Sequence, residues 1–276
     1  MNPPATEKDR IVAEVRERYG EIAKGGGSCC LPSSACGATE ASVSLGVGYR
    51  KDEIESLPEG ADLGLGCGAP VAQLALRDGE TVLDLGSGAG IDAFLAARQV
   101  GPRGRVIGVD MTPEMLERAR ANARKAGLAQ VEFREGRLES LPVGDASVDA
   151  VTSNCVINLV PDKGRVFAEI ARVLKPGGRM VISDVVLDGR LPEAVEKDVY
   201  AYTGCVAGAA LRERYFGQLR DAGLGAVEIL RDVDYLAALR DSAPEEAEAL
   251  LRRTGVAWES VAGKVRSITF RARRTG

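Results

Sequence analysis

The hydrophobic and polar positions of the chain alternate in blocks, and these blocks predict strands and helices in turn. Short apolar runs predict strands at residues 81–85, 105–110, 131–136, 147–155 and 179–186. Apolar residues at helical spacing predict helices after residue 91, over 113–127 and over 163–174. This rhythm predicts an α/β fold with a doubly wound, mostly parallel, Rossmann-like sheet and right-handed crossovers.

The two ends of the chain follow a less regular pattern. An amphipathic helix is predicted over 6–20, and a mostly helical insertion over 190–222. Strands are expected at 226–230 and 265–271, with a helix at 244–253 between them. We therefore predict three parts: an N-terminal helix with lid loops (1–70), the sheet core (71–190), and a helical insertion with closing strands in a short α+β part (191–276).

Two glycine-rich segments lack any periodicity. Residues 25–38, GGGSCCLPSSACGA, contain Cys29, Cys30 and Cys36, and residues 61–70, ADLGLGCGAP, contain Cys67. Glycine lowers the cost of unusual backbone angles and raises the entropy lost when one shape is held. We expect both segments to be mobile loops that close when a ligand binds.

Composition and charge narrow the class of protein. The 276 residues are 45% hydrophobic and 28% charged, which is typical of soluble globular proteins. A net charge of −4 gives no electrostatic footprint for nucleic acid or an anionic membrane surface. The polar first residues and the lack of a long apolar run predict neither a secretory signal nor a membrane span. We expect a cytoplasmic location, where cysteines are more often metal-binding or catalytic than disulfide-bonded.

The segment TVLDLGSGAG, residues 81–90, predicts a strand, a tight glycine turn and a helix N-terminus that together cradle a nucleotide. Its G-x-G-x-G spacing differs from the G-x-G-x-x-G of dinucleotide-binding proteins. Asp84 can accept a hydrogen bond from an amino group, which suits the methionine end of S-adenosylmethionine better than a pyrophosphate. Asp110 ends the next strand, where a carboxylate meets ribose hydroxyls in βαβ folds.

The cysteines supply the other candidate chemistry, since the chain has six cysteines and no histidine. Cys155 ends the fourth predicted strand, at the edge where ligands bind in open α/β sheets. Cys67, Cys155 and Cys205 are flanked by small or polar residues, and three thiols from three segments make a soft-ligand site. Buried, inert cysteines are the plain alternative.

Two occupants suit such a site. Zinc would require a fourth ligand, which the cysteines of residues 29–36 can supply. Trivalent arsenic is thiophilic and three-coordinate, and its lone pair can attack a sulfonium methyl group directly. No proton is removed in that reaction, so the histidine that commonly acts as a base is not needed.

The motifs DLGSGAG, VIGVD and VLKPGG resemble those of the class I S-adenosylmethionine-dependent methyltransferases. With GLGCG, SNCVINL and YTGCVAGA, the chain resembles the arsenite methyltransferases over about residues 45–222. The resemblance implies that arsenic(III) binds to Cys67, Cys155 and Cys205 and that a further N-terminal cysteine assists. We favour Cys36, which is nearest to Cys67 and stands apart from Cys29 and Cys30. The implied cofactor-binding residues are Asp84, Gly86, Ser87, Gly88, Asp110, Met111, Leu138, Glu139 and Asn154.

The function implied by this resemblance is methyl transfer from S-adenosylmethionine to thiolate-bound arsenic(III), delivered as arsenite or a thiol complex. Glutathione or thioredoxin would act as the thiol reductant. Two alternatives stay open from the residues alone. One is a methyltransferase of a small organic metabolite, and the other is a non-catalytic thiol-based protein that binds a metalloid or zinc.

Overall fold

A computed structural model describes residues 7–25, 40–198, 201–202, 205–242 and 244–275. A sheet of eight strands runs through the molecule in the order β3-β2-β1-β4-β5-β8-β7, with β6 pairing beside β5. The strands are β1 (Thr81–Leu85), β2 (Arg105–Asp110), β3 (Val131–Glu135), β4 (Val148–Asn154), β5 (Leu174–Leu187), β6 (Ala210–Leu211), β7 (Leu224–Asp234) and β8 (Val265–Arg274). Strands β1 to β5 are parallel, whereas β8 is antiparallel to β5 and β7. The predicted mostly parallel, doubly wound sheet is confirmed.

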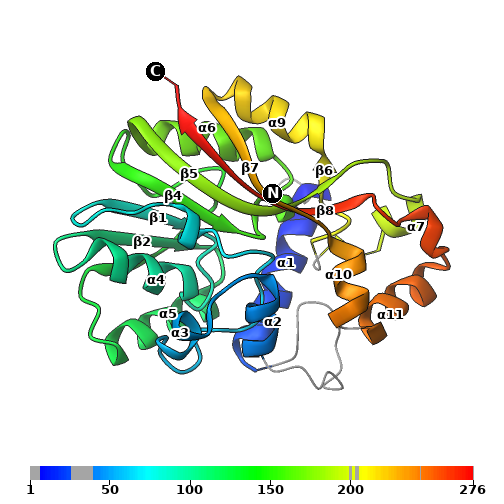
Figure 1. Cartoon of the computed structure of the whole chain (residues 1–276), viewed down its shortest axis with the longest axis horizontal. Helices are drawn as coiled ribbons and strands as arrows, with labels where there is room; N and C mark the ends of the chain where they lie inside the picture. Colours follow the sequence, from blue (N-terminus) through cyan, green and yellow to red (C-terminus); the bar gives the residue numbers. More distant parts are fainter. Residues whose placement is uncertain (1–6, 26–39, 199–200, 203–204, 243, 276) are drawn as a thin grey trace, which may run out of the picture.

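Helices cover both faces of the sheet, which explains why the strands read as continuous apolar runs (Figure 1). On one face lie α4 (Ile91–Val100) and α5 (Pro113–Lys125), which share a buried core with β1 and β2. On the other face lie α6 (Lys163–Val173) and α9 (Arg212–Asp221), whose apolar residues pack with β4, β5 and β8. Each fully buried aliphatic or aromatic side chain contributes about 1.5–3 kcal/mol.

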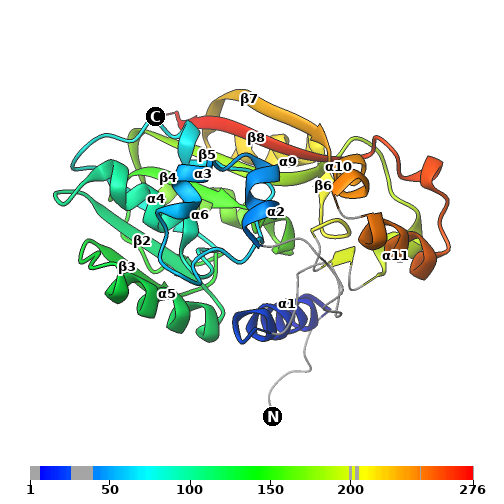
Figure 2. The same ribbon diagram turned by 60° about the horizontal axis from the view of Figure 1, so that its bottom comes forward.

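The N-terminal helix α1 (Glu7–Ala23) packs beside α5, although the two helices are far apart in sequence (Figure 2). Lys24 pairs with Glu114 at 2.9 Å, and the Arg118 guanidinium donates to the Ala23 carbonyl at 3.0 Å. Two short helices follow, α2 (Glu40–Val47) and α3 (Lys51–Glu55). The sequence pattern predicted neither of them. Both are too short to show helical periodicity clearly.

The insertion predicted to be mostly helical contains more than helices. It holds α7 (Glu193–Glu196) and α9, and between them β6 pairs with the end of β5 at Val186 and Ala210. A strand of two residues leaves no alternating pattern to recognise. Helices α10 (Tyr235–Ser242) and α11 (Pro244–Thr254) then lead to β8, with 3₁₀ turns η1 (Val71–Gln73), η2 (Ile157–Leu159) and η3 (Trp258–Ser260) elsewhere. Strands β7 and β8 join the same sheet as the core.

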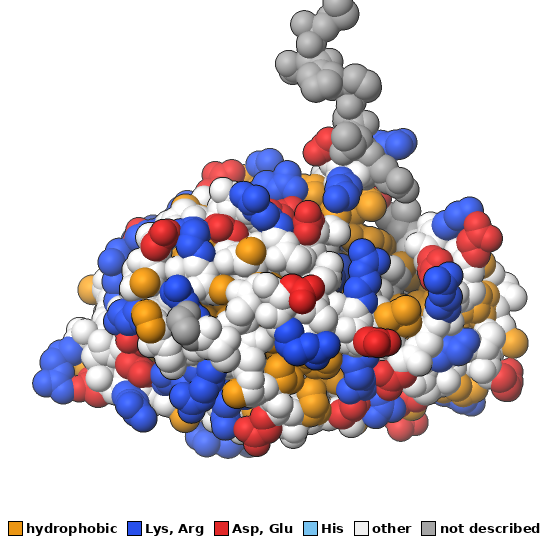
Figure 3. Space-filling model, turned by 90° about the horizontal axis from the view of Figure 1, so that it is seen from above, with side chains coloured by type: hydrophobic (Ala, Val, Ile, Leu, Met, Phe, Trp, Pro, Cys, Tyr) orange, Lys and Arg blue, Asp and Glu red, His pale blue; other side chains and the backbone are white. Residues whose placement is uncertain are grey.

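The distribution of charged side chains on the surface is consistent with the modest net charge. On the face shown in Figure 3, acidic and basic side chains are intermingled. Among the described helices, none is both long and apolar enough to cross a membrane.

Candidate active site

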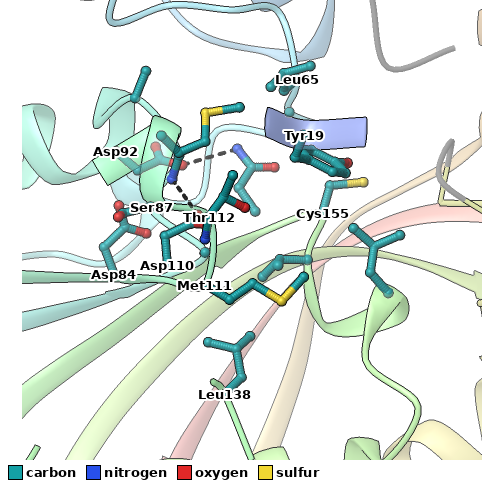
Figure 4. Close-up of a pocket in the computed structure, with 18 of the residues that line it drawn as sticks. Tyr19, Leu65, Asp84, Ser87, Asp92, Asp110, Met111, Thr112, Leu138 and Cys155 are labelled. Atoms are coloured by element: carbon teal, nitrogen blue, oxygen red, sulfur yellow. Dashed lines mark hydrogen bonds between the residues drawn. The ribbon is translucent and has the colours of Figure 1, made fainter. Parts of the chain in front are cut away.

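One pocket lies at the carboxyl ends of β1, β2 and β4, where parallel α/β sheets bind their ligands (Figure 4). It brings together all nine residues that the resemblance to the family implies for the cofactor. These are Asp84, Gly86, Ser87, Gly88, Asp110, Met111, Leu138, Glu139 and Asn154. Cys155 lines the same pocket, and Val12, Val15 and Tyr19 of α1 cover part of it.

The glycine turn after β1 has a steric reason. Gly86 has φ +66°, and a Cβ atom there would lie 2.5 Å from the Val156 side chain. Glycine therefore lets the chain leave β1 directly beneath the segment that follows β4. Gly88 has φ +50°, and its N–H donates to Asp110 Oδ2 at 3.0 Å.

Asp110 is fixed at the end of β2 by two backbone bonds. Its Oδ2 accepts from the N–H of Gly88, and its Oδ1 accepts from the N–H of Thr112 at 2.8 Å. Burial raises the pKa of Asp110, and these two bonds oppose that shift. Each carboxylate oxygen retains a lone pair, so Asp110 can still accept from ligand hydroxyls.

Asp84 is buried with only 2% of its surface exposed, and its Oδ2 has no hydrogen-bond partner among the described residues. Burial, with the nearby charges of Asp92 and Asp110, raises its pKa well above the usual range. The Ser87 hydroxyl is also buried, without a hydrogen-bond partner in the described part of the chain. Figure 4 shows Asp84, Asp92 and Asp110 on one side of the pocket, with Cys155 across from them beside Tyr19. Crowded carboxyls, one of which has an unsatisfied oxygen, suit a ligand that is positively charged and carries donors.

The third acid, Asp92, was missed by the sequence analysis. Its carboxylate accepts from the Tyr49 hydroxyl at 2.9 Å and from Asn154 Nδ2 at 3.1 Å. Burial raises its pKa to about 6. At the start of α4, Asp92 reads as an ordinary N-terminal acid. One signal was available, because Asp92 shares a helix face with the buried Leu95.

Cys67, Cys155 and Cys205 meet in one buried cluster, although they stand 88 and 50 positions apart in sequence. The Cys205 thiol donates to the Cys155 carbonyl at 3.3 Å. Hydrogen bonds between the Cys155 thiol and those of Cys205 and Cys67, together with burial, raise the pKa of Cys155 well above its usual value. Burial also raises the pKa of Cys67. Cys67 and Cys155 are therefore protonated near neutral pH.

Two of these cysteines have strained backbones. Cys155 has φ +58° and Cys205 has φ +69°, in the left-handed region that side chains rarely adopt. Such strain costs about 1–3 kcal/mol per residue and persists only where the surroundings impose it. The Cys155 N–H donates to the Ser183 carbonyl at 2.8 Å, and Asn158 Nδ2 donates to the Cys205 carbonyl at 3.2 Å.

The loop that carries Cys67, which we expect to be a mobile lid, is hydrogen-bonded to the sheet in this structure. The Cys67 N–H donates to Asn154 Oδ1 at 3.0 Å, and the Ser267 hydroxyl donates to the Cys67 carbonyl at 2.8 Å. A Cβ atom on Gly68 would overlap the Ser183 side chain. The glycines here allow the close packing of this conformation. Cys36, with Cys29 and Cys30, lies outside the described residues.

A preformed metal centre is not found in the described residues, where no group of three or more histidine, cysteine, aspartate or glutamate side chains could hold a metal ion. The three thiols instead hydrogen-bond within their cluster. A zinc site completed by Cys29, Cys30 or Cys36 would involve residues beyond those described.

Comparison with known proteins identifies the family. The methyltransferase-domain family matches residues 76–241, more than half of the chain. The crystal structure of an arsenic(III) S-adenosylmethionine methyltransferase from Chlamydomonas reinhardtii is 33% identical, with a TM-score of 0.59, over 86% of this chain and 74% of that one. The chain belongs to the arsenite methyltransferase family, within the methyltransferase-domain proteins.

Other arsenite methyltransferases are also similar to this chain in sequence. The protein of Halobacterium salinarum is 54% identical over 78% of this chain and 57% of its own length. The human arsenite methyltransferase is 34% identical over 72% of this chain and 54% of its own length. The chain thus spans little more than half the length of these curated relatives.

Proposed function

We propose that this chain transfers the methyl group of S-adenosylmethionine to trivalent arsenic bound by Cys67, Cys155 and Cys205. The observation that carries the proposal is the buried cluster of three thiols that adjoins an acid-lined pocket through Cys155. The similarity to arsenite methyltransferases supports the same reaction.

The residues of the pocket fit the methyl donor. When bound, S-adenosylmethionine supplies an electrophilic methyl group on a positively charged sulfur. Asp84, with its unpartnered buried oxygen, would accept from the ammonium group, and Asp110 from the ribose hydroxyls. Met111 and Leu138 would enclose the adenine, beside Glu139, which is paired with Arg137 at 2.9 Å.

Arsenic capture must displace thiol protons, since the pKa values of Cys67 and Cys155 are raised. When arsenite arrives as its trihydroxide, three As–S bonds form and three waters leave, which carries the protons away. When a thiol complex arrives, each proton passes to the departing thiol. Soft sulfur ligands favour arsenic over hard metal ions.

The lone pair of arsenic then forms the As–C bond while the S–C bond breaks, so that sulfur keeps the electron pair and arsenic is formally oxidised by two electrons. No proton leaves arsenic, so the absence of histidine is no obstacle. Catalysis rests on orientation, which can contribute about 7–11 kcal/mol. Return of the oxidised product to the trivalent state needs two electrons, which two thiols of glutathione or thioredoxin supply as they form a disulfide.

The proposal is tested by incubating the protein with arsenite, a thiol and S-adenosylmethionine labelled in the methyl group, followed by mass analysis of the arsenic species. We expect the label on arsenic with the wild type and its loss in Cys155→Ser. A wild-type protein that binds the methyl donor yet leaves arsenic unmethylated would contradict the proposal and favour a small organic acceptor.

A further inference from the structure

The side chain of Asn154 joins the two halves of the proposed active site. Its Oδ1 accepts from the Cys67 N–H at 3.0 Å, and its Nδ2 donates to the Gly68 carbonyl at 2.7 Å. The same Nδ2 lies 2.8 Å from the Tyr49 hydroxyl and 3.1 Å from Asp92 Oδ2. One amide group therefore contacts both the arsenic-binding loop and the acids of the pocket.

Asn154 is well placed to transmit a change between these parts. It is the last residue of β4, where it pairs with Ser183 of β5, so the sheet holds its backbone. The loop approaches its side chain closely, because a Cβ atom on Gly66 would lie 2.8 Å from Asn154 Nδ2. A side chain at residue 66 would push the loop, and Cys67 with it, away from β4.

The other end of this connection lies among the pocket acids. Tyr49 is buried and donates to Asp92 Oδ1 at 2.9 Å while it contacts Asn154. The charge of Asp92 in turn acts on Asp84, whose Oδ2 lacks a hydrogen-bond partner among the described residues. A cation that binds beside these acids changes the negative charge that Asp92 presents to Tyr49 and Asn154.

We infer that Asn154 is a positioning residue that couples occupancy of the methyl-donor pocket to the position of Cys67. Binding of the cationic donor beside Asp84 and Asp92 fixes the Asn154 amide, which holds the Cys67 loop against β4. Arsenic binding and donor binding then strengthen each other by the same factor, because coupling is reciprocal. This inference rests on the proposed function and adds to it cooperative binding of the two substrates.

The test measures the Kd of arsenite by calorimetry, with and without sinefungin, which keeps a positive charge at the reacting position but transfers no methyl group. We expect sinefungin to tighten arsenite binding by about fivefold or more in the wild type. In Asn154→Ala the two Kd values should agree within about twofold, although both ligands still bind. Tyr49→Phe keeps the bonds of Asn154 to the loop and removes one link to Asp92. The ratio of its arsenite Kd without sinefungin to that with sinefungin should therefore be intermediate.

A matched control is Asn122→Ala. Asn122 is a buried asparagine whose side chain donates to the Ala89 carbonyl of the glycine turn, at 3.2 Å, and has no bond to the Cys67 loop. Its ratio should equal that of the wild type. A purely structural role for Asn154 would lower the unfolding temperature and both affinities but preserve the ratio.

A wild-type ratio near one, or an unchanged ratio in Asn154→Ala, would overturn the inference. If Asn154→Ala fails to fold, Tyr49→Phe provides the test. A Kd ratio in Tyr49→Phe equal to that of the wild type would likewise overturn the inference. A wild type that binds neither arsenite nor sinefungin would overturn the proposed function itself, and this inference with it.

Discussion

At the scale of single residues, the site is built from groups that are unfavourable in the absence of ligands. Asp84 has a buried carboxylate oxygen that no described residue hydrogen-bonds, and Cys155 and Cys205 have left-handed backbones. Such features reduce stability and are kept where a ligand compensates for them. Each can therefore be tested by a substitution that affects binding and stability in different ways.

The first prediction concerns Asp84→Asn, which removes the buried charge and keeps the shape of the side chain. We expect the affinity for S-adenosylmethionine to fall by about 1.5–3 kcal/mol, because a charge-assisted hydrogen bond to its ammonium group is lost. The unliganded protein should be no less stable, since repulsion with Asp92 and Asp110 is relieved. Calorimetry and thermal unfolding measure both quantities. An unchanged affinity would remove Asp84 from the donor site.

The second prediction concerns the arsenic ligands. Cys205→Ser should abolish methylation of arsenite, because a hydroxyl is a hard and poor ligand for a soft centre. Cys29→Ser is the comparison, in which we expect little loss. Rates of formation of methylated arsenic measure the effect, with circular dichroism as a check on folding. Equal inactivity of the two variants would show that the ligands are wrongly chosen.

At the scale of elements, the sequence predicted the sheet core well and its surroundings poorly. Strands such as β1 and β4 are buried on both faces, so their apolar runs are long enough to recognise. The two-residue strand β6 and the short helix α3 carry no period, and their positions depend on tertiary contacts. For the same reason, local pattern could not reveal that Tyr49 reaches the pocket.

The Cys67 loop shows a second limit of local pattern. Its glycines predicted mobility, and local pattern gave no sign that they also let the loop pack on Asn154 and Ser183. The glycine turn at residues 86–90, by contrast, was predicted from its place between a strand and a helix. Position relative to regular elements was more informative than the number of glycines.

The third prediction follows from that packing. Gly68→Ala places a Cβ atom against Ser183, so the loop must shift. We expect a loss of about 1–3 kcal/mol of stability from overpacking and a marked loss of arsenite binding. The control is Gly217→Ala in α9, where a Cβ atom meets nothing within 4 Å. That variant should gain about 1 kcal/mol from helix propensity and bind normally. Chemical denaturation and calorimetry measure the two effects, and normal binding by Gly68→Ala would contradict the proposed role of the loop.

At the scale of the whole molecule, the sheet brings distant segments to one edge. Cys67 precedes the core, Cys155 follows β4, and Cys205 belongs to the insertion, yet all three are buried together. The same edge gathers Asp84, Asp92 and Asp110 into one pocket. Through these acids, donor affinity and the stability of the protein should depend on pH.

The fourth prediction is that affinity for a cationic methyl donor rises with pH around 6. Burial raises the pKa of Asp92 to about 6, so the carboxyl is protonated below that pH and cannot favour a cation. Affinity should fall by up to about tenfold per pH unit below 6 for one proton released on binding. The stability of the unliganded protein changes with pH in the opposite direction. The folded state binds protons more tightly than the unfolded state, so this contribution declines as pH rises from about 4 to 6.

Calorimetry between pH 5 and 8, in two buffers of different ionisation enthalpy, measures the affinity and the protons released. Asp92→Asn should flatten the profile in this range. A flat wild-type profile would mean that Asp92 does not titrate with donor binding.

The central claim is that three thiols from three parts of the chain bind one arsenic atom. The most direct measurement is X-ray absorption at the arsenic edge, on arsenite bound to the wild type and to Cys155→Ser. We expect three sulfur neighbours in the wild type and the replacement of one by oxygen in the variant. An identical sulfur count in both proteins would contradict the account.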